Sequence, residues 1–422
     1  MKLTVVGGGS TYTPELVDGL ARLGDNLDVE ELVLLDPDVE RLEVVGGFAQ
    51  RILQQRGSTT RLSLTSDRES AIDGASAVLL QLRVGGQAAR AGDESFPLTC
   101  GCVGQETTGA GGLAKALRTV PVVLDIAETV RKRAHPDAWI VDFTNPVGIV
   151  TRALLQEGHR AIGLCNVAIG FQRLFAEYLD VTPEQVDLGH VGLNHLTWIR
   201  EVTVAGKDVL PGILAKYGEE LAQRLELPRS LLDRLGVIPS YYLRYFYAHD
   251  QVVTELLRTG TRAEAVQKIE HDLLEMYADP ALVSKPALLD QRGGAYYSEA
   301  AVALIASLLG GPSHAGTHVA NVRNDGTLAF LPDDAVIEVP CDVSASGATS
   351  RAVKPLEPLY AGLVAHVSAY EDLALDAALR GGYDRVAKAL LAHPLVGQYD
   401  VALKLTDALL AGNQEHLSWS RS

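Results

Sequence analysis

The sequence predicts an α/β fold, with an N-terminal doubly wound Rossmann-like domain over residues 1–165 and a C-terminal mixed, mainly helical α+β domain over residues 166–422. Two observations predict it. In the first third of the chain, continuous apolar runs alternate with helical patterns, which is typical of parallel strands covered by helices on both faces. After residue 165, amphipathic helical patterns dominate and only short strand-like runs lie among them.

The N-terminal elements follow in order along the chain. Residues 3–6 form a short apolar run that ends in a glycine triplet, and Thr13-Pro14 is typical of a helix start with Thr13 as the N-cap. Further strands are predicted at residues 32–35, 77–81 and 139–143, and helices at residues 39–55 and 113–133. Buried strands separated by helices predict a doubly wound parallel sheet.

The C-terminal elements are mainly helices. Helices are predicted at residues 169–179, 241–258, 262–277 and 298–309, with three more after Pro358, and strands at residues 198–204 and 336–339. The chain contains no internal repeat, low-complexity segment or linker rich in Pro and Ser. We therefore expect the two domains to pack tightly, with the active site in the crevice between them.

Composition argues against several classes of protein. The 422 residues carry a formal net charge of -16, whereas nucleic-acid-binding proteins normally present a basic face. No apolar stretch is long enough for a membrane helix, and the N-terminus lacks the apolar core of a signal peptide. Four cysteines in so long a chain do not make a disulfide framework. We expect a cytoplasmic protein that binds neither nucleic acid nor membrane.

A dinucleotide site is indicated near the N-terminus. Gly7, Gly9 and Ser10 lie in a loop between the first strand and a helix start, where backbone N–H groups can face a pyrophosphate. Tyr12 stands where the usual fingerprint has its third glycine. Asp36 ends the second strand, where a carboxylate can bind a ribose hydroxyl, which favours NAD over NADP. The alternative is that the glycines only make a tight turn and Asp36 caps a helix.

Three features of the second half are ambiguous on the residues alone. Cys165 follows a predicted strand and His195 lies far from it in sequence, so a buried thiol and a core imidazole explain them as well as a metal site does. Tyrosines surround Arg244. They are compatible with core packing, or with a phenol whose pKa a nearby positive charge lowers.

Segments spread over most of the chain carry a resemblance to a known family. They are GGGSTYTPEL (7–16), RVGGQAAR (83–90), VGQETTG (103–109), DFTNP (142–146), CNVA (165–168), GLNHLTW (192–198), YLRYFY (242–247), RGGAYYSEAA (292–301) and NVRNDGTLAFLPDDAVIEVPC (321–341). With these segments in this order, the chain resembles glycoside hydrolase family 4 from end to end. The resemblance implies an NAD-binding domain over residues 1–165 and a metal- and substrate-binding, catalytic domain over residues 166–422.

The resemblance also assigns roles to single residues. Cys165 and His195 match the ligands of a divalent metal, usually manganese. Tyr242 matches the catalytic base, and Glu106 matches an acidic residue that tunes it. The matches to substrate-binding positions are Arg90, Asn145, Asn166 and Arg292; Asn166 in particular resembles the 6-phospho-β-glucosidases.

Two positions depart from the family pattern. Ala168 and Tyr241 stand where the family commonly has proline. Because Tyr241 adjoins Tyr242, the base can be either of the two tyrosines. The departures also leave open the exact substrate within the family.

The function implied by the resemblance is hydrolysis of 6-phospho-β-glucosides, small phosphorylated disaccharides or glycosides, by a homo-oligomer, a dimer or tetramer. NAD oxidises carbon 3 of the sugar, which acidifies carbon 2; the base removes that proton, the leaving group is eliminated, water adds, and the ketone is re-reduced. A divalent metal stabilises the enediolate. The alternatives are another family 4 glycosidase, such as a 6-phospho-α-glucosidase or an α-galactosidase, a malate- or lactate-type NAD dehydrogenase, or a non-catalytic NAD-binding sensor.

Overall fold

Parallel strands of the N-terminal half form a sheet in the order β3-β2-β1-β4-β5-β6 in the computed structural model, which describes residues 1–22, 27–293 and 296–421. Residues 294 and 295 of the RGGAYYSEAA segment lie outside the described residues. The strands are β1 (Lys2–Val6), β2 (Glu31–Leu35), β3 (Arg61–Thr65), β4 (Ala77–Leu80), β5 (Trp139–Asp142) and β6 (Ala161–Gly163). This strand order defines a doubly wound dinucleotide-binding fold. The predicted fold class is confirmed.

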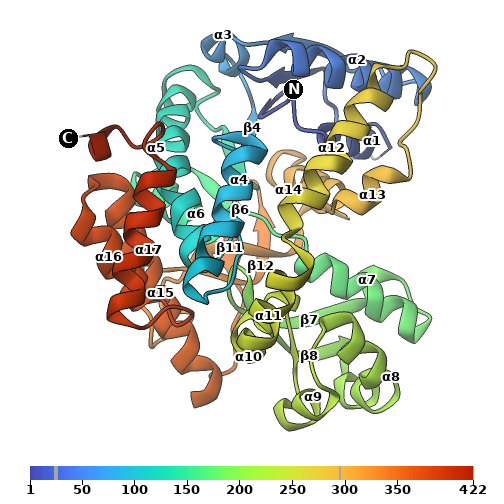
Figure 1. Cartoon of the computed structure of the whole chain (residues 1–422). Coiled ribbons are helices and arrows are strands. Elements are labelled where there is room, and N and C mark those ends of the chain that lie inside the picture. The colour runs from blue at the N-terminus through green and yellow to red at the C-terminus, as the bar shows by residue number, and fades with distance from the viewer. Residues whose placement is uncertain (23–26, 294–295, 422) are drawn as a thin grey trace.

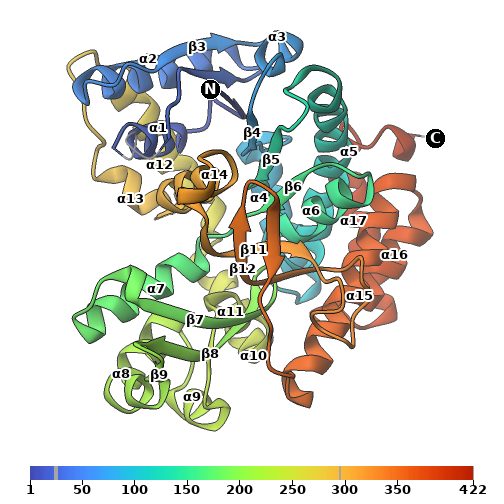
Figure 2. The ribbon, with the colours of Figure 1, turned by 180° about the vertical axis from the view of Figure 1, so that it is seen from behind.

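Helices cover both faces of this parallel sheet. On one side α1 (Thr13–Arg22) packs with α2 (Val39–Gln55), and on the other α5 (Gly109–Arg133) packs with α3 (Arg68–Ile72) and α6 (Val147–Gln156). Figures 1 and 2 show the two groups of helices on either side of the strands. Because both faces are covered, β1, β2 and β4 are almost entirely buried, which explains their continuous apolar runs.

The sheet continues into the C-terminal half through antiparallel strands. Beyond β6 the order is β11-β12-β7-β8-β10, with β13 paired to β12 and β9 paired to β8. These strands are β7 (Val186–Leu193), β8 (Leu196–Val204), β9 (Lys207–Asp208), β10 (Ile238–Pro239), β11 (Gly316–Arg323), β12 (Val336–Ser344) and β13 (Gly347–Ser350). One sheet therefore crosses residue 165, and the domain boundary placed there stays a prediction.

The remaining helices belong mainly to the C-terminal half, as predicted. They are α4 (Gly86–Ser95), α7 (Val167–Leu179), α8 (Leu210–Leu225), α9 (Arg229–Leu235), α10 (Arg244–Tyr247), α11 (His249–Thr259), α12 (Arg262–Ala278), α13 (Leu288–Arg292), α14 (Tyr297–Leu309), α15 (Pro358–Arg380), α16 (Tyr383–Ala392) and α17 (Tyr399–Gly412). The three helices predicted after Pro358 are α15, α16 and α17, and all three pack beside α5 (Figure 1).

The single helix predicted over residues 241–258 is wrong. The chain forms a 3-10 turn at Tyr241–Leu243 and the short helix α10, and it bends at Ala248 (φ -133°) before α11 begins. The aromatic spacing looked helical, but tertiary contacts fix these rings instead: the Trp198 indole N–H donates to the Tyr247 hydroxyl (3.1 Å). The broken geometry lets neighbouring tyrosines point in different directions.

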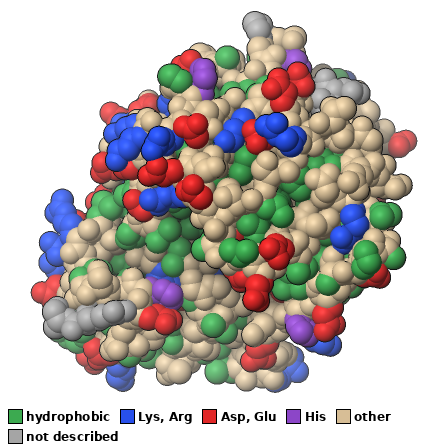
Figure 3. All heavy atoms as spheres, turned by 90° about the horizontal axis from the view of Figure 1, so that it is seen from above, with side chains coloured by type: hydrophobic (Ala, Val, Ile, Leu, Met, Phe, Trp, Pro, Cys, Tyr) green, Lys and Arg blue, Asp and Glu red, His purple; other side chains and the backbone are tan. Residues whose placement is uncertain are grey.

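The helices and the surface charge are relevant to the prediction that the protein binds neither membrane nor nucleic acid. No helix in the described ranges has the length and apolar character needed to cross a membrane. On the face seen in Figure 3, Lys and Arg side chains lie among Asp and Glu side chains rather than gathering in a basic patch. That mixture agrees with the formal net charge of -16.

Candidate active site

A cavity of about 770 Å³ opens at the carboxyl ends of the parallel strands and reaches the C-terminal half. It brings together every predicted site residue except Cys165. Those that line it are Gly7, Gly9, Ser10, Asp36, Arg90, Glu106, Asn145, Asn166, His195, Tyr242 and Arg292. Residues more than 280 positions apart in sequence thus share one cavity, in the crevice where the active site was expected.

The glycine loop forms the dinucleotide end of the cavity. Gly7 has a φ of +87°, and a Cβ there would lie 2.8 Å from the Gln81 carbonyl oxygen. A Cβ on Gly8 would lie 2.7 Å from the Leu34 Cβ. The loop therefore packs closely against the ends of β2 and β4, where the Gly7 and Gly8 N–H groups both donate to the Leu35 carbonyl (2.9 Å). The loop and the first turn of α1 line the cavity, and a helix N-terminus favours a bound pyrophosphate.

Asp36 secures the same loop from the end of β2. Its carboxylate accepts from the Gly9 N–H (2.9 Å) and the Asp38 N–H (3.0 Å), while Arg41 Nε donates to the Gly9 carbonyl (2.6 Å). The carboxylate is an acceptor with lone pairs to spare, so it can also receive a ribose hydroxyl. It would repel a 2′-phosphate, which keeps the preference for NAD.

Glu106 is held by three cations. Lys115 Nζ lies 2.7 Å and Arg90 Nε 3.3 Å from its carboxylate, and Arg83 binds both carboxylate oxygens. Burial alone would favour the neutral acid, but Lys115, Arg83 and Arg90 lower the pKa of Glu106 well below its usual range. Burial, together with Arg83, lowers the pKa of Lys115 to about 8. Glu106 is an ionised carboxylate, not a proton donor.

Positive charge predominates in the cavity. Among the described residues that line it, six are basic (Arg41, Arg83, Arg90, Lys115, Arg262, Arg292) and four are acidic (Asp36, Asp38, Glu106, Glu270). Arg292 is paired with Glu270 (2.9 Å) and donates to the Thr11 hydroxyl (2.6 Å). A cationic cavity in a chain of net charge -16 suits an anionic ligand.

The two candidate bases differ in their surroundings. The Tyr242 ring stacks on the His195 imidazole, with centroids 3.5 Å apart and planes 9° from parallel. Burial raises the pKa of Tyr242 well above its usual value, and Cys165 adds to the shift. Tyr241 instead accepts a hydrogen bond from Arg244 Nη1 (2.9 Å). Arg244, the arginine among the tyrosines, therefore donates to Tyr241, whereas Tyr242 is the tyrosine that stacks on His195.

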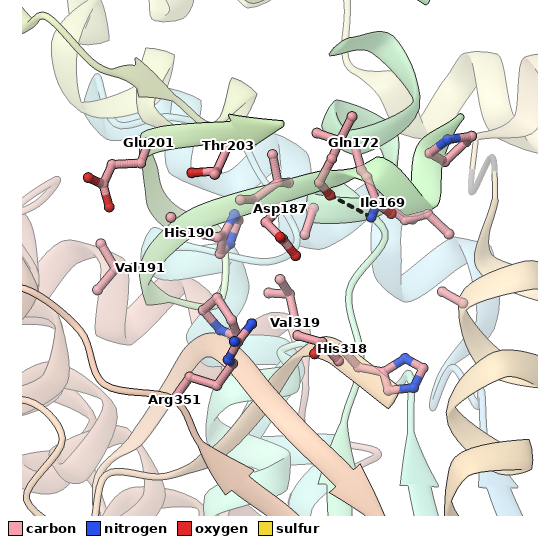
Figure 4. Close-up of a pocket in the computed structure, with 18 of the residues that line it drawn as sticks. Ile169, Gln172, Asp187, His190, Val191, Glu201, Thr203, His318, Val319 and Arg351 are labelled. Atoms are coloured by element: carbon pink, nitrogen blue, oxygen red, sulfur yellow. Dashed lines mark hydrogen bonds between the residues drawn. The ribbon is translucent and has the colours of Figure 1, made fainter. Parts of the chain in front are cut away.

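Cys165 lies outside the cavity lining but close to it. It is buried, it lines a groove shown in Figure 4, and its pKa is raised by burial and by Glu338. The next residue, Asn166, lines the cavity. Cys165 acts electrostatically on both Tyr242 and Tyr297, so the thiol adjoins the tyrosine cluster.

The donor set fits a catalytic metal. In the described ranges no group of three or more His, Cys, Asp or Glu is arranged around a metal position, so the two predicted ligands, Cys165 and His195, have no third partner among these residue types. Thr107 Oγ1 lies 3.0 Å from His195 Nδ1, which leaves Nε2 for a ligand. Asn145 Oδ1 is buried in the cavity wall without a hydrogen-bond partner. A catalytic metal needs open positions for substrate and water, and two protein ligands leave them.

Several residues of the site escaped the sequence reasoning. Lys115 is 3% exposed, and a lysine in the small and apolar run GAGGLAKAL was the signal that could have found it. Thr107 lies in the segment VGQETTG (103–109), in which the resemblance assigns a role only to Glu106. Tyr297 is partly buried between Tyr12 and Phe143, with ring centroids 6.0 and 5.6 Å away. No local pattern pointed to Tyr297.

The fold and the cavity define an enzyme class: a Rossmann-type protein whose dinucleotide loop and stacked tyrosine–histidine pair line one cationic cavity, with a buried thiol close by. Sequence comparison identifies the family. The family 4 glycosyl hydrolase domain matches residues 2–181, and the family 4 glycosyl hydrolase C-terminal domain matches residues 190–396. The chain belongs to glycoside hydrolase family 4, and it is a glycosidase.

Individual relatives cover the whole chain. It is 39% identical to a probable 6-phospho-β-glucosidase of Bacillus subtilis over 99% of this chain and 97% of the relative. It is similar to the 6-phospho-β-glucosidase structure of Thermotoga maritima with NAD and glucose 6-phosphate, with a TM-score of 0.92, 36% identity and 99% of both chains covered. Another structure of that enzyme also contains manganese, and its TM-score to this chain is 0.91. A Salinibacter ruber malate dehydrogenase shares the fold alone (TM-score 0.53, 17% identity, 90% of this chain and 98% of that one).

Proposed function

We propose that the protein hydrolyses 6-phospho-β-glucosides, with NAD and a divalent metal, preferably Mn²⁺, as cofactors. The observation that carries the proposal is the stacking of Tyr242 on His195, beside Cys165, in the same cationic cavity as the glycine loop. Full-length relatives that are named 6-phospho-β-glucosidases support the substrate class. A simple dehydrogenase would leave the thiol, the imidazole and the stacked phenol without a task.

The N-terminal residues bind the dinucleotide. Gly7, Gly9 and Ser10 line the end of the cavity where the pyrophosphate would lie against the N-terminus of α1, and Asp36 would accept from a ribose hydroxyl. When bound, NAD supplies a hydride acceptor that is restored within each turnover. The predicted division into a domain of residues 1–165 for NAD and a domain of residues 166–422 for metal and substrate follows this assignment, although the glycine loop and the metal pair share one sheet.

Cys165 and His195 would hold the metal through Sγ and Nε2. When bound, the cation supplies Lewis-acid stabilisation of negative charge on sugar oxygens. Tyr242 is placed to remove the proton from carbon 2 of the oxidised sugar, because it lies flat against the His195 ring. Glu106 stays ionised among three cations and fixes the local charge that Tyr242 senses. Tyr241 is occupied by Arg244 and is not the base in this proposal.

The substrate is bound by polar side chains on the cavity wall. Asn145 carries a buried and unpaired Oδ1 that can accept from a sugar hydroxyl. Asn166, Arg90 and Arg292 line the same wall. Arg262 donates to the main-chain carbonyl of Gln291 (2.8 Å). It lines the cavity and forms no ion pair with a carboxylate in the described part of the chain. We assign the sugar phosphate to the cationic rim where Arg262 lies.

The test compares matched substrates and cofactors. Aryl β-glucosides with and without a 6-phosphate are incubated with enzyme stripped of metal and dinucleotide, and NAD and Mn²⁺ are then added separately and together. We expect hydrolysis of the phosphorylated substrate only when both are present, without net NADH. Undiminished hydrolysis by the stripped enzyme, or NADH formed in proportion to product, would refute the proposal. An aryl 6-phospho-α-glucoside tests the alternative within the family.

Two further parts of the proposal concern the whole molecule. We propose a cytoplasmic enzyme, since its cysteines are all free and phosphorylated sugars are intracellular compounds. We also propose a homo-oligomer, a dimer or tetramer, which analytical ultracentrifugation of the purified chain tests directly.

A further inference from the structure

A line of paired residues crosses the sheet between the two predicted metal ligands. Gly163 of β6 pairs with Asn321 of β11, Asn321 pairs with Glu338 of β12, and Glu338 pairs with Gly192 of β7. The β6–β11 and β12–β7 junctions each consist of that one residue pair. Cys165 lies two residues after Gly163, and His195 lies three residues after Gly192. This line is therefore the shortest path through the sheet from one ligand to the other.

Both glycines of this line allow close packing of the strands that carry the predicted ligands. A Cβ at Gly163 would lie 2.8 Å from the Asn321 Cβ and 2.3 Å from the Thr151 hydroxyl. Gly192 has a φ of +151°, and a Cβ there would lie 2.0 Å from the Leu196 carbonyl oxygen. A side chain at Gly163 would push β6 away from β11, and one at Gly192 would push β7 away from β8 and so distort the turn that carries His195.

Glu338 lies at the centre of this line and is 1% exposed. Its carboxylate accepts hydrogen bonds from His190 Nε2 (2.8 Å), Asn194 Nδ2 (2.9 Å) and Asn321 Nδ2 (3.1 Å). The donors come from β7, from the β7–β8 turn and from β11. Figure 4 shows His190 on β7 at the groove of about 1360 Å³ that Cys165 also lines. A buried carboxylate with three donors is fixed in position.

Asn194 connects this carboxylate to both ligands. Its amide donates to Glu338 (2.9 Å), and it is one of the groups that favour the thiolate form of Cys165, which places it against the thiol. It also precedes His195, whose φ of 62° gives the turn between β7 and β8 its left-handed backbone. Rotation of the Asn194 side chain would therefore release the thiol and disturb the turn that carries the imidazole.

We propose that Glu338 is a positioning residue of the metal centre: by fixing Asn194, it holds the Cys165 thiol and the His195 imidazole in the relative orientation that a divalent cation requires. The inference rests on the proposed metal pair. Glu338 itself touches neither metal nor substrate. It acts through hydrogen bonds, in the way that groups behind metal ligands fix the orientation of those ligands.

The experiment measures metal binding without turnover. Co²⁺ and Mn²⁺ are titrated into the metal-free, full-length enzyme and its variants, with thiolate-to-Co²⁺ charge-transfer absorption and the electron paramagnetic resonance signal of free Mn²⁺ as readouts. Groups of this kind typically change metal affinity about 10- to 100-fold. We expect Glu338→Gln to weaken binding by that factor and to reduce the thiolate absorption of the Co²⁺ complex.

Control variants make each outcome decisive. Asp93→Asn removes another buried carboxylate, one that pairs with Arg118 (2.6 Å), and should leave metal affinity unchanged. Asn194→Ala leaves Glu338 bound to His190 and Asn321, and it should lower metal affinity as Glu338→Gln does. It therefore keeps the inference testable if the Glu338→Gln protein does not fold. Folded Glu338→Gln and Asn194→Ala proteins with wild-type metal affinity would overturn the inference. If His195→Ala also binds metal normally, the proposed metal pair itself is wrong.

Discussion

The buried charge cluster around Glu106 permits a quantitative test by a double-mutant cycle with Lys115. The Glu106 carboxylate and the Lys115 ammonium are 7% and 3% exposed and 2.7 Å apart. Glu106→Gln leaves Lys115, Arg83 and Arg90 without this anion. Lys115→Met leaves Glu106 with two arginines. Glu106→Gln should therefore be the more destabilising change.

The magnitude follows from the burial. Removing one partner of a buried ion pair costs about 3–5 kcal/mol, and Glu106→Gln should fall in that range. Lys115→Met should cost about 1–3 kcal/mol, because Glu106 keeps charged donors. An unfolding entropy of about 2.1 cal/mol/K per residue gives roughly 0.9 kcal/mol/K for 422 residues. A cost of 3–5 kcal/mol thus lowers Tm by about 3–6 °C if the chain unfolds cooperatively.

The assay is calorimetric unfolding of the wild type, both single variants and the double variant. In the double variant no ammonium is left buried beside a neutral amide, so its loss of stability should be smaller than the sum of the single losses. We expect a coupling free energy of about 0.5–3 kcal/mol, the range measured for residues in one ion-pair network. Losses that add within 0.5 kcal/mol would show that the Glu106–Lys115 contact has no such energetic role.

Three further predictions concern the base, the phosphate and a buried acid. Tyr242→Phe should lower turnover about 10²- to 10⁴-fold and stop solvent deuterium from entering carbon 2 of the product, whereas Tyr241→Phe should retain the exchange, read by NMR; the opposite pattern moves the base to Tyr241. Arg262→Gln should raise KM for the phosphorylated glucoside more than it lowers kcat, and an unchanged KM would exclude Arg262 from phosphate binding. Burial raises the pKa of Glu371 to about 8, an effect that Arg152 only partly offsets, against about 4.3 in an unfolded chain. The protonated form therefore stabilises the fold fully below about pH 4.3, and this stabilisation is lost as the pH rises through 8. Glu371→Gln should flatten the fall of Tm between pH 5 and pH 9, and parallel Tm profiles for the two proteins would contradict the assignment.

The parts of the fold that local patterns determine were predictable. β1, β2, β4 and β5 lie within one or two residues of the predicted runs, because a strand buried on both faces must be apolar at every position. The glycine loop and Asp36 were predictable for a similar reason, since backbone contacts at Gly7 exclude a side chain. The identities of these residues are imposed by their immediate surroundings.

The parts that depend on long-range contacts were not predictable from local patterns. The broken helix after Tyr241 follows from rings that pack on His195 and Trp198, which belong to another strand pair. The pairing of Glu338 with Gly192 joins positions 146 residues apart, and nothing near Glu338 in sequence indicates it. Only the match of many segments in order predicts that Cys165 and His195 share one site, because their spacing carries no metal signature.

The environment of Tyr242 connects base strength to metal loading. Burial, Cys165 and Glu106 all raise the pKa of Tyr242, and the nearest arginine of its own segment, Arg244, is bound to Tyr241. No described contact of this phenol favours phenolate, so without a further charge it stays protonated at neutral pH. A divalent cation at the proposed ligands Cys165 and His195 would supply that charge next to the stacked ring, and its two positive charges would outweigh the one negative charge of the thiolate that binds it. The same two ligands would therefore serve to stabilise the sugar oxyanion and to generate the base that creates it.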